Sequence, residues 1–293
     1  MKAFGKLHPV TLLVYFVMML AFSMFLRNPV TAGLSLLGSI AFCCTLTDRR
    51  EKLEDLKFYL PLSALIVLTN PLVSHNGRTP LFFVNGNAFT LEAIWYGVFI
   101  AGMIAAVLLW SKAYSKIFTS DKFLYLFGRI LPKTALILSV ALRYVPLLKA
   151  QAARLKDAQK TLGLFSTGSI ADNVISAVKV YAALVAWSLE NAVETGRHMK
   201  ARGWNTVRRT AFSTFRFRVT DAVFLAVFAA AGTLLLLAAA KGTLYFSFYP
   251  APTPLPADPV SVSAYALFGG LAFLPFFTET EESIRWTCLR SKI

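Results

Sequence analysis

Long apolar runs separated by short polar breaks make up most of the chain. Six of these runs are long and apolar enough to be interpreted as helices that span a bilayer. They cover residues 10–26, 30–46, 58–73, 93–110, 219–240 and 260–277. Only Arg27-Asn28-Pro29 separates the first two runs, which predicts a tight turn between antiparallel helices. The pattern therefore predicts an all-α, polytopic integral membrane protein with about six transmembrane helices.

Composition supports the same class. Hydrophobic residues make up 56% of the 293 residues and aromatic residues 14%, and the hydrophobic share exceeds that of typical soluble domains. The first run is expected to remain as a span, because Arg27-Asn28-Pro29 stands where a signal peptide would need small residues for cleavage.

Basic residues collect on alternate loops, and cytoplasmic loops hold the excess of lysine and arginine. Lys2 and Lys6 place the N-terminus inside, and residues 47–57 form an inside loop with four basic residues. The loops predicted to lie outside hold one basic residue each and cover residues 27–29, 74–90 and 241–259. Both termini are therefore expected to be cytoplasmic.

The strongest concentration of charge lies in the centre of the chain. Residues 111–218 contain 18 basic and five acidic residues, a balance of +13 out of +15 for the whole chain. Positive-inside bias and contact with anionic lipid headgroups account for most of this positive charge. A role in nucleic-acid binding is disfavoured, because no recognition module accompanies the charge. The chain thus divides into an N-terminal transmembrane region (1–110), a basic cytoplasmic region (111–218) and a C-terminal hairpin with its tail (219–293).

Two of the outside loops predict different structures. Short apolar runs flank Asn85-Gly86 in residues 79–90, and this dipeptide favours the tight turn of a β-hairpin. Residues 249–259 contain five prolines, which predicts an extended, stiff connector.

The central region is predicted to contain long helices that leave the membrane. An amphipathic, interfacial helix is expected over residues 121–131, ending at Pro132. Residues 134–142 and 174–189 are apolar but short for full spans, so they are interpreted as the roots of two projecting helices.

Each root leads into a polar helix. In residues 147–163, Leu148, Ala152, Leu155 and Leu162 recur at helical spacing, with basic residues elsewhere on the wheel. In residues 188–203 the predicted apolar stripe consists of Leu189, Ala192, Val193, Gly196 and Met199.

The polar face of the second helix carries Glu190, Glu194, Arg197 and His198, and Gly203 is expected to cap its C-terminus. The acidic and basic spacings alone are typical of any solvated helix face. The complete sequence of residues 188–203 is a more specific signal than these spacings, because it has a partial counterpart at Ala158-Gln-Lys-Thr-Leu-Gly163.

These strings resemble the transmembrane T component of energy-coupling factor (ECF) transporters, a family that includes membrane subunits of cobalt, nickel and vitamin importers. The resemblance rests on residues 121–132, Leu142-Arg-Tyr-Val-Pro146, residues 158–163 and residues 189–203. It implies two coupling helices that bind grooves on two ATP-binding cassette ATPases, and a small membrane S component that binds the substrate. It assigns ATPase coupling to Ala201, Arg202, Gly203, Glu190, Glu194, Arg197, Lys160, Leu162 and Gly163.

One position departs from the family pattern. Ala201-Arg202-Gly203 fits the Ala-Arg-Gly-like motif, but Leu162 stands where an arginine is expected before Gly163, with only Lys160 basic nearby. This difference suggests an unequal contact with two non-identical ATPases. A guanidinium is suited to such a contact because its rigid fork of donors fixes orientation better than an ammonium does.

Several other functions are disfavoured. The six runs hold ionisable residues only near their ends, unlike ion-coupled carriers. There is no His-Glu-x-x-His motif or phosphate-binding Gly-x-x-x-x-Gly-Lys loop, and the three cysteines lack metal-type spacing. No catalytic residue, metal or cofactor is therefore expected. Small residues at four-residue steps are interpreted as a packing surface, inside the chain or for the S component: Ala222, Ala226 and Ala230.

The sequence thus predicts a non-catalytic subunit in the plasma membrane of a prokaryote. By the resemblance, it would couple ATP hydrolysis by its partners to uptake of a vitamin or of cobalt or nickel. The alternatives are a membrane subunit of another ATP-driven transporter and a membrane anchor for a different cytoplasmic complex.

Overall fold

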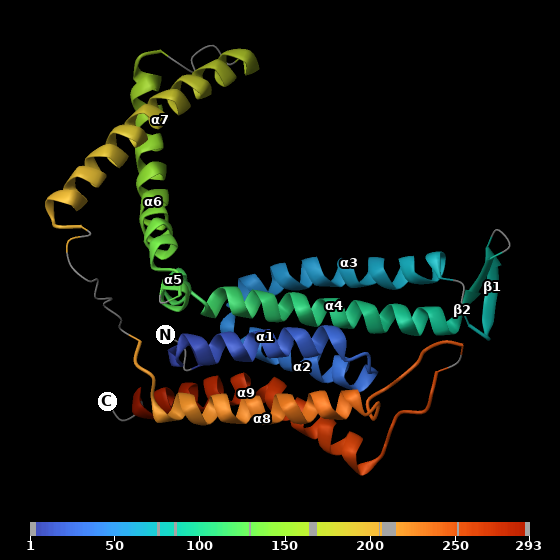
Figure 1. Ribbon diagram of the computed structural model, residues 1–293. Coiled ribbons are helices and arrows are strands. Elements are labelled where there is room, and N and C mark those ends of the chain that lie inside the picture. The colour runs from blue at the N-terminus through green and yellow to red at the C-terminus, as the bar shows by residue number, and fades with distance from the viewer. Residues whose placement is uncertain are drawn as a thin grey trace. The chain divides into compact units, whose positions relative to one another are not determined.

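A computed structural model describes residues 4–74, 77–84, 87–128, 130–163, 169–204, 206, 215–250 and 252–290. Its elements are, in chain order, a 3-10 helix (Phe4–Lys6), α1 (Pro9–Phe25), α2 (Pro29–Leu46), α3 (Arg49–Val73), β1 (Pro80–Val84), β2 (Asn87–Thr90), α4 (Leu91–Ile117), α5 (Ser120–Gly128), α6 (Pro132–Thr161), α7 (Ile170–Ala201), α8 (Val219–Ala240) and α9 (Pro259–Arg290) (Figure 1). They form two compact units. The first comprises Met1–Lys122 and Phe215–Ile293, and the second Phe123–Thr214.

The prediction of an all-α, polytopic membrane protein is confirmed. In the described residues, α2, α3, α4, α6, α7, α8 and α9 are long and apolar enough to cross a membrane, and α1 is a shorter apolar helix. The predicted spans coincide with α1–α4, α8 and α9, but several helices are longer than the apolar runs. For example, α3 begins at Arg49 and α9 ends at Arg290. A charged turn outside hydrocarbon keeps its backbone hydrogen bonds, so apolarity marks only part of a helix.

Local capping explains the short break between α1 and α2. The Asn28 side chain accepts a hydrogen bond from the Val30 N–H at 2.9 Å, and Pro29 occupies the first turn of α2. Similarly, Nδ1 of His8 accepts from the Val10 N–H at 3.3 Å before Pro9 opens α1. Both are favoured N-terminal arrangements, because proline lacks the N–H that a first turn leaves unpaired.

Aromatic side chains fill the centre of the first unit. Several of the rings meet edge to face, as do Phe4 and Tyr15 with centroids 5.2 Å apart. The fully buried rings belong to Phe4, Tyr15, Phe16, Phe42, Trp110, Phe228 and Phe268. The buried indole of Trp110 donates to the Ser35 hydroxyl at 3.1 Å. The core thus satisfies the polar edge of its largest ring while burying the remainder.

Glycine allows α2 and α9 to approach closely. A Cβ atom added to Gly38 would lie 2.8 Å from the Cβ of Ala272 and 2.9 Å from its carbonyl oxygen. By contrast, a Cβ on Gly33, also in α2, would meet no atom within 4 Å. Small residues at helix contacts are a general means of packing in membranes.

In the second unit, α6 and α7 cross as an antiparallel pair (Figure 1). The Tyr144 hydroxyl on α6 lies 2.8 Å from the Thr195 hydroxyl on α7 and donates to the Asn191 carbonyl at 3.3 Å. Each predicted apolar root is continuous with its polar helix. Pro146 lies inside α6 without dividing it, so the two long helices are confirmed.

The predicted faces of these helices are only partly correct. Leu148, Ala152 and Leu155 of α6 are half-buried, as expected. The predicted stripe of α7 is largely wrong, since Leu189 and Val193 are 64% and 58% exposed and Ala192 and Gly196 are exposed too. Of the predicted stripe, only Met199 is half-buried; in the same part of α7 the other half-buried residues include Leu184, Trp187, Asn191 and Thr195. Hydrogen bonding to Tyr144 turns a polar face of α7 toward α6.

The interfacial helix also ends earlier than predicted. α5 ends at Gly128, and Leu131 is the N-cap of α6 with φ −128° and ψ 75°. A residue before proline is pushed out of the helical region by the proline ring, so Leu131 cannot continue α5 into Pro132.

The two loops agree with their predictions. β1 and β2 form an antiparallel hairpin in which Val84 pairs with Asn87; the turn residues 85 and 86 lie outside the described part of the chain. The proline-rich connector contains neither helix nor strand between residue 252 and the start of α9.

We expect Gly38→Ala to destabilise the protein by about 1–3 kcal/mol, because the new methyl group would overpack the α2–α9 contact. Thermal unfolding of the detergent-purified protein, followed by circular dichroism, measures the change. Gly33→Ala is the matched control in the same helix and should leave the melting temperature unchanged or raise it. Equal melting temperatures for the two variants would contradict the close approach.

Candidate functional site: the exposed ends of two long helices

α7 ends in a backbone motif that closes the helix without using side chains. Arg202 is the C-cap, and Gly203 follows with φ +78°. The Gly203 N–H donates to the Lys200 carbonyl, and the Trp204 N–H donates to the Met199 carbonyl, both at 3.0 Å. This is the Schellman arrangement. The predicted glycine cap at Gly203 is therefore confirmed.

α6 ends in nearly the same way. Leu162 is its C-cap, with φ −84° and ψ 7°, against −80° and 11° for Arg202. Gly163 then adopts φ +88°, and its N–H donates to the Lys160 carbonyl at 3.0 Å. Leu162 and Arg202 thus occupy equivalent positions in two equivalent helix ends.

The side chains at these positions differ in chemistry and are both accessible. Leu162 is 76% exposed, and Arg202 is exposed as well. Backbone N–H groups already bind carbonyls at the end of α7, and no hydrogen bond or ion pair joins the Arg202 side chain to another described residue.

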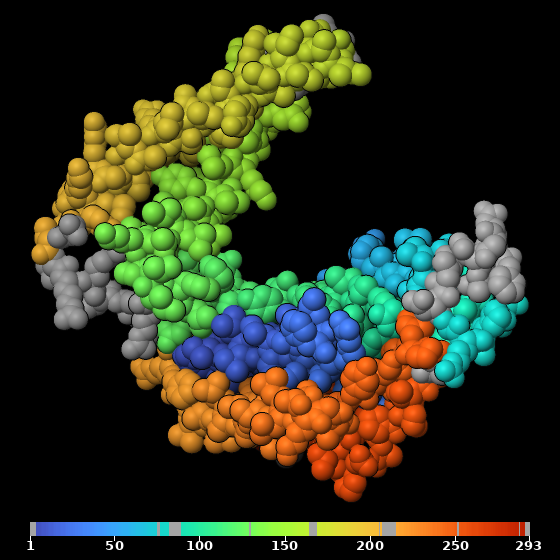
Figure 2. Space-filling model, turned by 45° about the vertical axis from the view of Figure 1, so that its right-hand side comes forward, coloured from blue at the N-terminus to red at the C-terminus, as the bar shows by residue number. Residues whose placement is uncertain are grey.

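The acidic residues predicted to accompany Arg202 lie on the exposed surface of α7. Glu190, Glu194 and Arg197 are all exposed. The Glu194 carboxylate lies 4.0 Å from Nε2 of His198, one turn further along. Because both side chains are solvated, this pair contributes little stability. Figure 2 shows α7, in yellow to gold, as a surface element along its length.

The predicted coupling residues form two separate groups. Lys160, Leu162 and Gly163 lie at the end of α6, whereas Glu190–Gly203 follow the last turns of α7. Since α6 and α7 run antiparallel across each other, these groups lie at opposite ends of the pair (Figure 1). The two groups therefore do not form one composite site.

The alanine stripe of α8 faces outward. Ala222, Ala226 and Ala230 are exposed, whereas Phe228, Ala231 and Leu235 are buried in the first unit. Internal packing, which the sequence favoured for the stripe, therefore does not account for these three alanines.

Sequence reasoning missed a group of buried polar residues in the first unit: His8, Lys122 and Asp221 at the starts of α1, α5 and α8, and Glu279 inside α9. Burial lowers the pKa of the Lys122 ammonium. Burial also lowers the pKa of His8, while the Asp221 carboxylate opposes that change more weakly. In the sequence, His8, Asp221 and Glu279 stand close to the ends of apolar runs, whereas Lys122 lies in the predicted interfacial helix.

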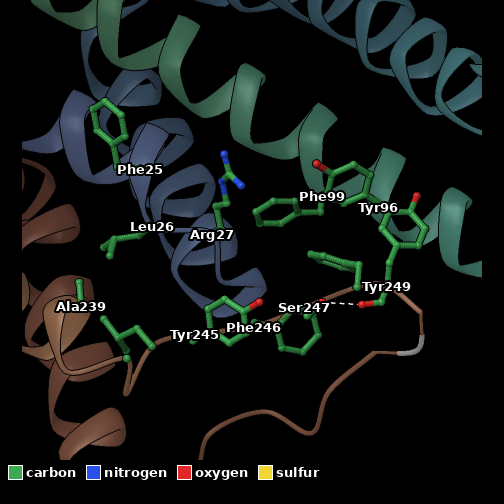
Figure 3. A pocket seen from close by; sticks show the side chains of 13 residues that line it. Phe25, Leu26, Arg27, Tyr96, Phe99, Ala239, Tyr245, Phe246, Ser247 and Tyr249 are labelled. Carbon is green, nitrogen blue, oxygen red and sulfur yellow. Dashed lines mark hydrogen bonds between the residues drawn. The ribbon is translucent and has the colours of Figure 1, made fainter. Parts of the chain in front are cut away.

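A cavity of about 350 Å³ lies where α1 ends and α4 begins (Figure 3). Seven aromatic residues line it together with Arg27, and the Ser247 hydroxyl donates to the Tyr249 carbonyl at 2.7 Å. Aromatic rings with one cation are typical of a membrane–water interface. The lining residues include no carboxylate, cysteine or histidine, and the described residues contain no cluster of three or more potential metal ligands.

Comparison with known proteins identifies related membrane proteins. A model of the cobalt transport protein family, CbiQ, matches residues 4–214. The energy-coupling factor transporter transmembrane protein EcfT of Staphylococcus aureus is 25% identical over 143 residues, which cover 46% of this chain and 53% of that protein. EcfT of Leuconostoc gelidum is 32% identical over 94 residues, 31% of this chain and 35% of the relative. The chain thus spans about half or less of the length of these relatives.

We expect Gly203→Ala to destabilise the end of α7 by about 1–2 kcal/mol, because an L-residue is strained at positive φ. Gly196→Ala, inside the same helix with no atom within 4 Å of the new Cβ, should instead stabilise α7 by about 0.5–1 kcal/mol. Hydrogen exchange of the last turn of α7 measures both effects, and slower exchange in Gly203→Ala would contradict the assigned cap.

Proposed function

The chain belongs to the CbiQ family of cobalt transport proteins, and we propose that it is the transmembrane T component of an ECF-type ABC importer. In this role it links two cytoplasmic ATPase subunits to a small membrane S component, which binds the substrate. The transported compound is a vitamin or a transition metal ion such as cobalt or nickel. ATP hydrolysis takes place in the partner subunits, and this chain is a non-catalytic scaffold of the plasma membrane.

The observation that carries this proposal is the pair of equivalent, exposed helix ends. Leu162 and Arg202 share one backbone conformation at opposite ends of a crossed helix pair. Two ATPase subunits need two docking points, and rigid helices transmit displacement better than loops. The Tyr144 hydroxyl, bonded to α7, helps α6 and α7 move together.

We base the membrane topology on the lengths of the apolar runs and on charge. We assign α1–α4, α8 and α9 to the bilayer, with both termini in the cytoplasm. α6 and α7 also contain apolar windows, but each continues into a polar, charged half. Basic residues recur in the second half of α6: Lys149, Arg154, Lys156 and Lys160. Such a helix fits the cytoplasmic face, where the headgroups are anionic.

In the proposed mechanism, the free energy of contact between the ATPases and the ends of α6 and α7 changes with the nucleotide state of the ATPases. ATP binding draws the two ATPases together, and the ends of α6 and α7 follow them. The membrane helices then tilt the S component so that its binding site opens inward. A ligand shifts a conformational equilibrium only by its differential affinity for the two states, so the helix ends must be held more tightly in one of them.

The exposed alanines of α8 are a proposed contact for the S component. Ala222, Ala226 and Ala230 line one face with small side chains. A flat surface of this kind lets a second helix approach closely in lipid, where packing replaces the hydrophobic effect.

The chemistry of the two ends implies two non-identical ATPases. Arg202 can donate to carboxylates or to carbonyls at a helix C-terminus, whereas Leu162 can offer only apolar contact. A single receptor surface cannot satisfy both side chains equally well, so each end should have its own partner subunit.

We expect Arg202→Glu to reduce ATPase co-purification about tenfold or more, since a reversed charge repels the carboxylates that a guanidinium binds. Lys241→Glu provides a matched control. Lys241 caps α8, and Gly242 follows with φ +72°, a glycine-capped end like that of α7. In the proposed topology Lys241 lies outside, so the control should retain its ATPases. Undiminished co-purification and uptake in Arg202→Glu would refute the assignment.

We expect Leu162→Glu to weaken attachment of one ATPase subunit while Leu162→Met preserves it, because methionine keeps an apolar side chain of similar volume. The ratio of the two ATPase subunits in the purified complex, measured by quantitative mass spectrometry, checks this. An unchanged ratio in Leu162→Glu would show that the side chain at the end of α6 does not contribute to docking.

A further inference from the structure

The N-terminal segment of the chain is held by an unusual number of buried polar contacts. The Phe4 N–H donates to the Glu279 carboxylate of α9 at 3.1 Å. The Gly5 carbonyl accepts from the Lys122 ammonium at 2.7 Å. The His8 N–H donates to the Asp221 carboxylate of α8 at 2.8 Å. Residues 4–8 thus contact three separate parts of the first unit through hydrogen bonds to charged groups.

These charged groups are buried deeply enough for the contacts to matter. Lys122 and Asp221 are each 3% exposed and Glu279 is 8% exposed. Hydrogen bonds to charged groups are stronger than those between neutral groups, and a buried charge that loses its partner is destabilising. Lys122 has a second acceptor in the Ile117 carbonyl at 2.9 Å, which ties the end of α4 to the same point.

Lys122 and Asp221 stand next to the two points where the chain passes between the units. Lys122 is the last residue before the chain leaves the first unit, and Phe215 is the first after its return. Soon after that return, the Arg218 N–H donates to the second oxygen of Asp221 at 2.9 Å. The His8 ring also meets Phe217 edge to face, with centroids 5.1 Å apart. The outgoing and the returning chain are therefore anchored on the same five residues.

We propose that residues 4–8 form an N-terminal clamp that joins both connections of the second unit to α8 and α9. Within the proposed function, on which this inference rests, displacement of the second unit by the ATPases would reach the membrane helices through the clamp. Lys122 is then a positioning residue. Without its ammonium, the outgoing connection loses its tie to residue 5 and can move without taking the N-terminal segment with it.

Spin-label distance measurements on the full complex, with its ATPases, test the clamp without knowledge of the substrate. Labels replace Leu65 on α3 and Leu236 on α8, both exposed, in a background without the three native cysteines. Distances are compared without nucleotide and after trapping with ATP and vanadate. We call the distance between the two labels in the vanadate-trapped, unsubstituted complex the trapped spacing. In Lys122→Met we expect the population with the trapped spacing to fall about tenfold, while ATP hydrolysis persists.

Lys112→Met is the matched control. Lys112 forms its ion pair with Asp55, inside the first unit and outside residues 4–8. The Lys112→Met complex should keep the trapped spacing of the unsubstituted protein. A Lys122→Met complex that behaves like this control would overturn the clamp. If the unsubstituted complex itself shows no nucleotide-dependent change, the proposed coupling function fails instead, so the two failures are distinguishable.

A second pair of variants decides the matter if Lys122→Met does not assemble. Glu279→Gln keeps an oxygen that can accept from the Phe4 N–H, whereas Glu279→Leu removes the acceptor. The clamp requires that Glu279→Gln retain the trapped spacing and that Glu279→Leu lose it. Equal trapped populations in these two variants would refute the proposal.

Discussion

Hydrocarbon offers no hydrogen-bond partners, so the polar groups at the end of a membrane helix must be satisfied by the protein or by water. In the first unit, buried charges meet this need. Asp221 accepts from the backbone at the start of α8, and Lys122 donates to the carbonyl of Ile117 at the end of α4. In the second unit, backbone N–H groups close the ends of α6 and α7. The same constraint is therefore met by buried charged side chains in the first unit and by backbone groups alone in the second, which leaves the side chains of Leu162 and Arg202 exposed.

The ends of α6 and α7 are informative because their backbone conformations are the same and their side chains differ. Leu162 and Arg202 have almost the same φ and ψ, and a glycine with positive φ follows each. Any difference in what they bind must therefore come from the side chains themselves. An exposed leucine favours an apolar receptor, whereas a guanidinium favours oxygen acceptors in a fixed plane. The asymmetry belongs to the chain and does not depend on the identity of its partners.

The packing of the first unit suits a scaffold that transmits displacement between its helices. Large aromatic rings are fully buried at its centre, and Gly38 brings α2 against α9 with no space for a methyl group. Close packing transmits displacement, because interiors at this density cannot deform continuously. Small residues that do not pack internally, such as Ala226, remain on the surface of α8. Rigidity inside and small residues outside are properties that a coupling subunit needs.

The sequence alone determined the membrane class, the six apolar spans, the β-hairpin and the glycine cap at Gly203. These features depend on apolar run length or on hydrogen bonds between residues close in the chain, and both can be read from local sequence. Tertiary structure decided which face of α7 meets α6, because the bond between Tyr144 and Thr195 outweighs the apolar stripe. It also decided that Ala222 is exposed and that Lys122 is buried against Gly5. Such outcomes depend on which distant segment packs alongside, and local periodicity carries no record of that choice.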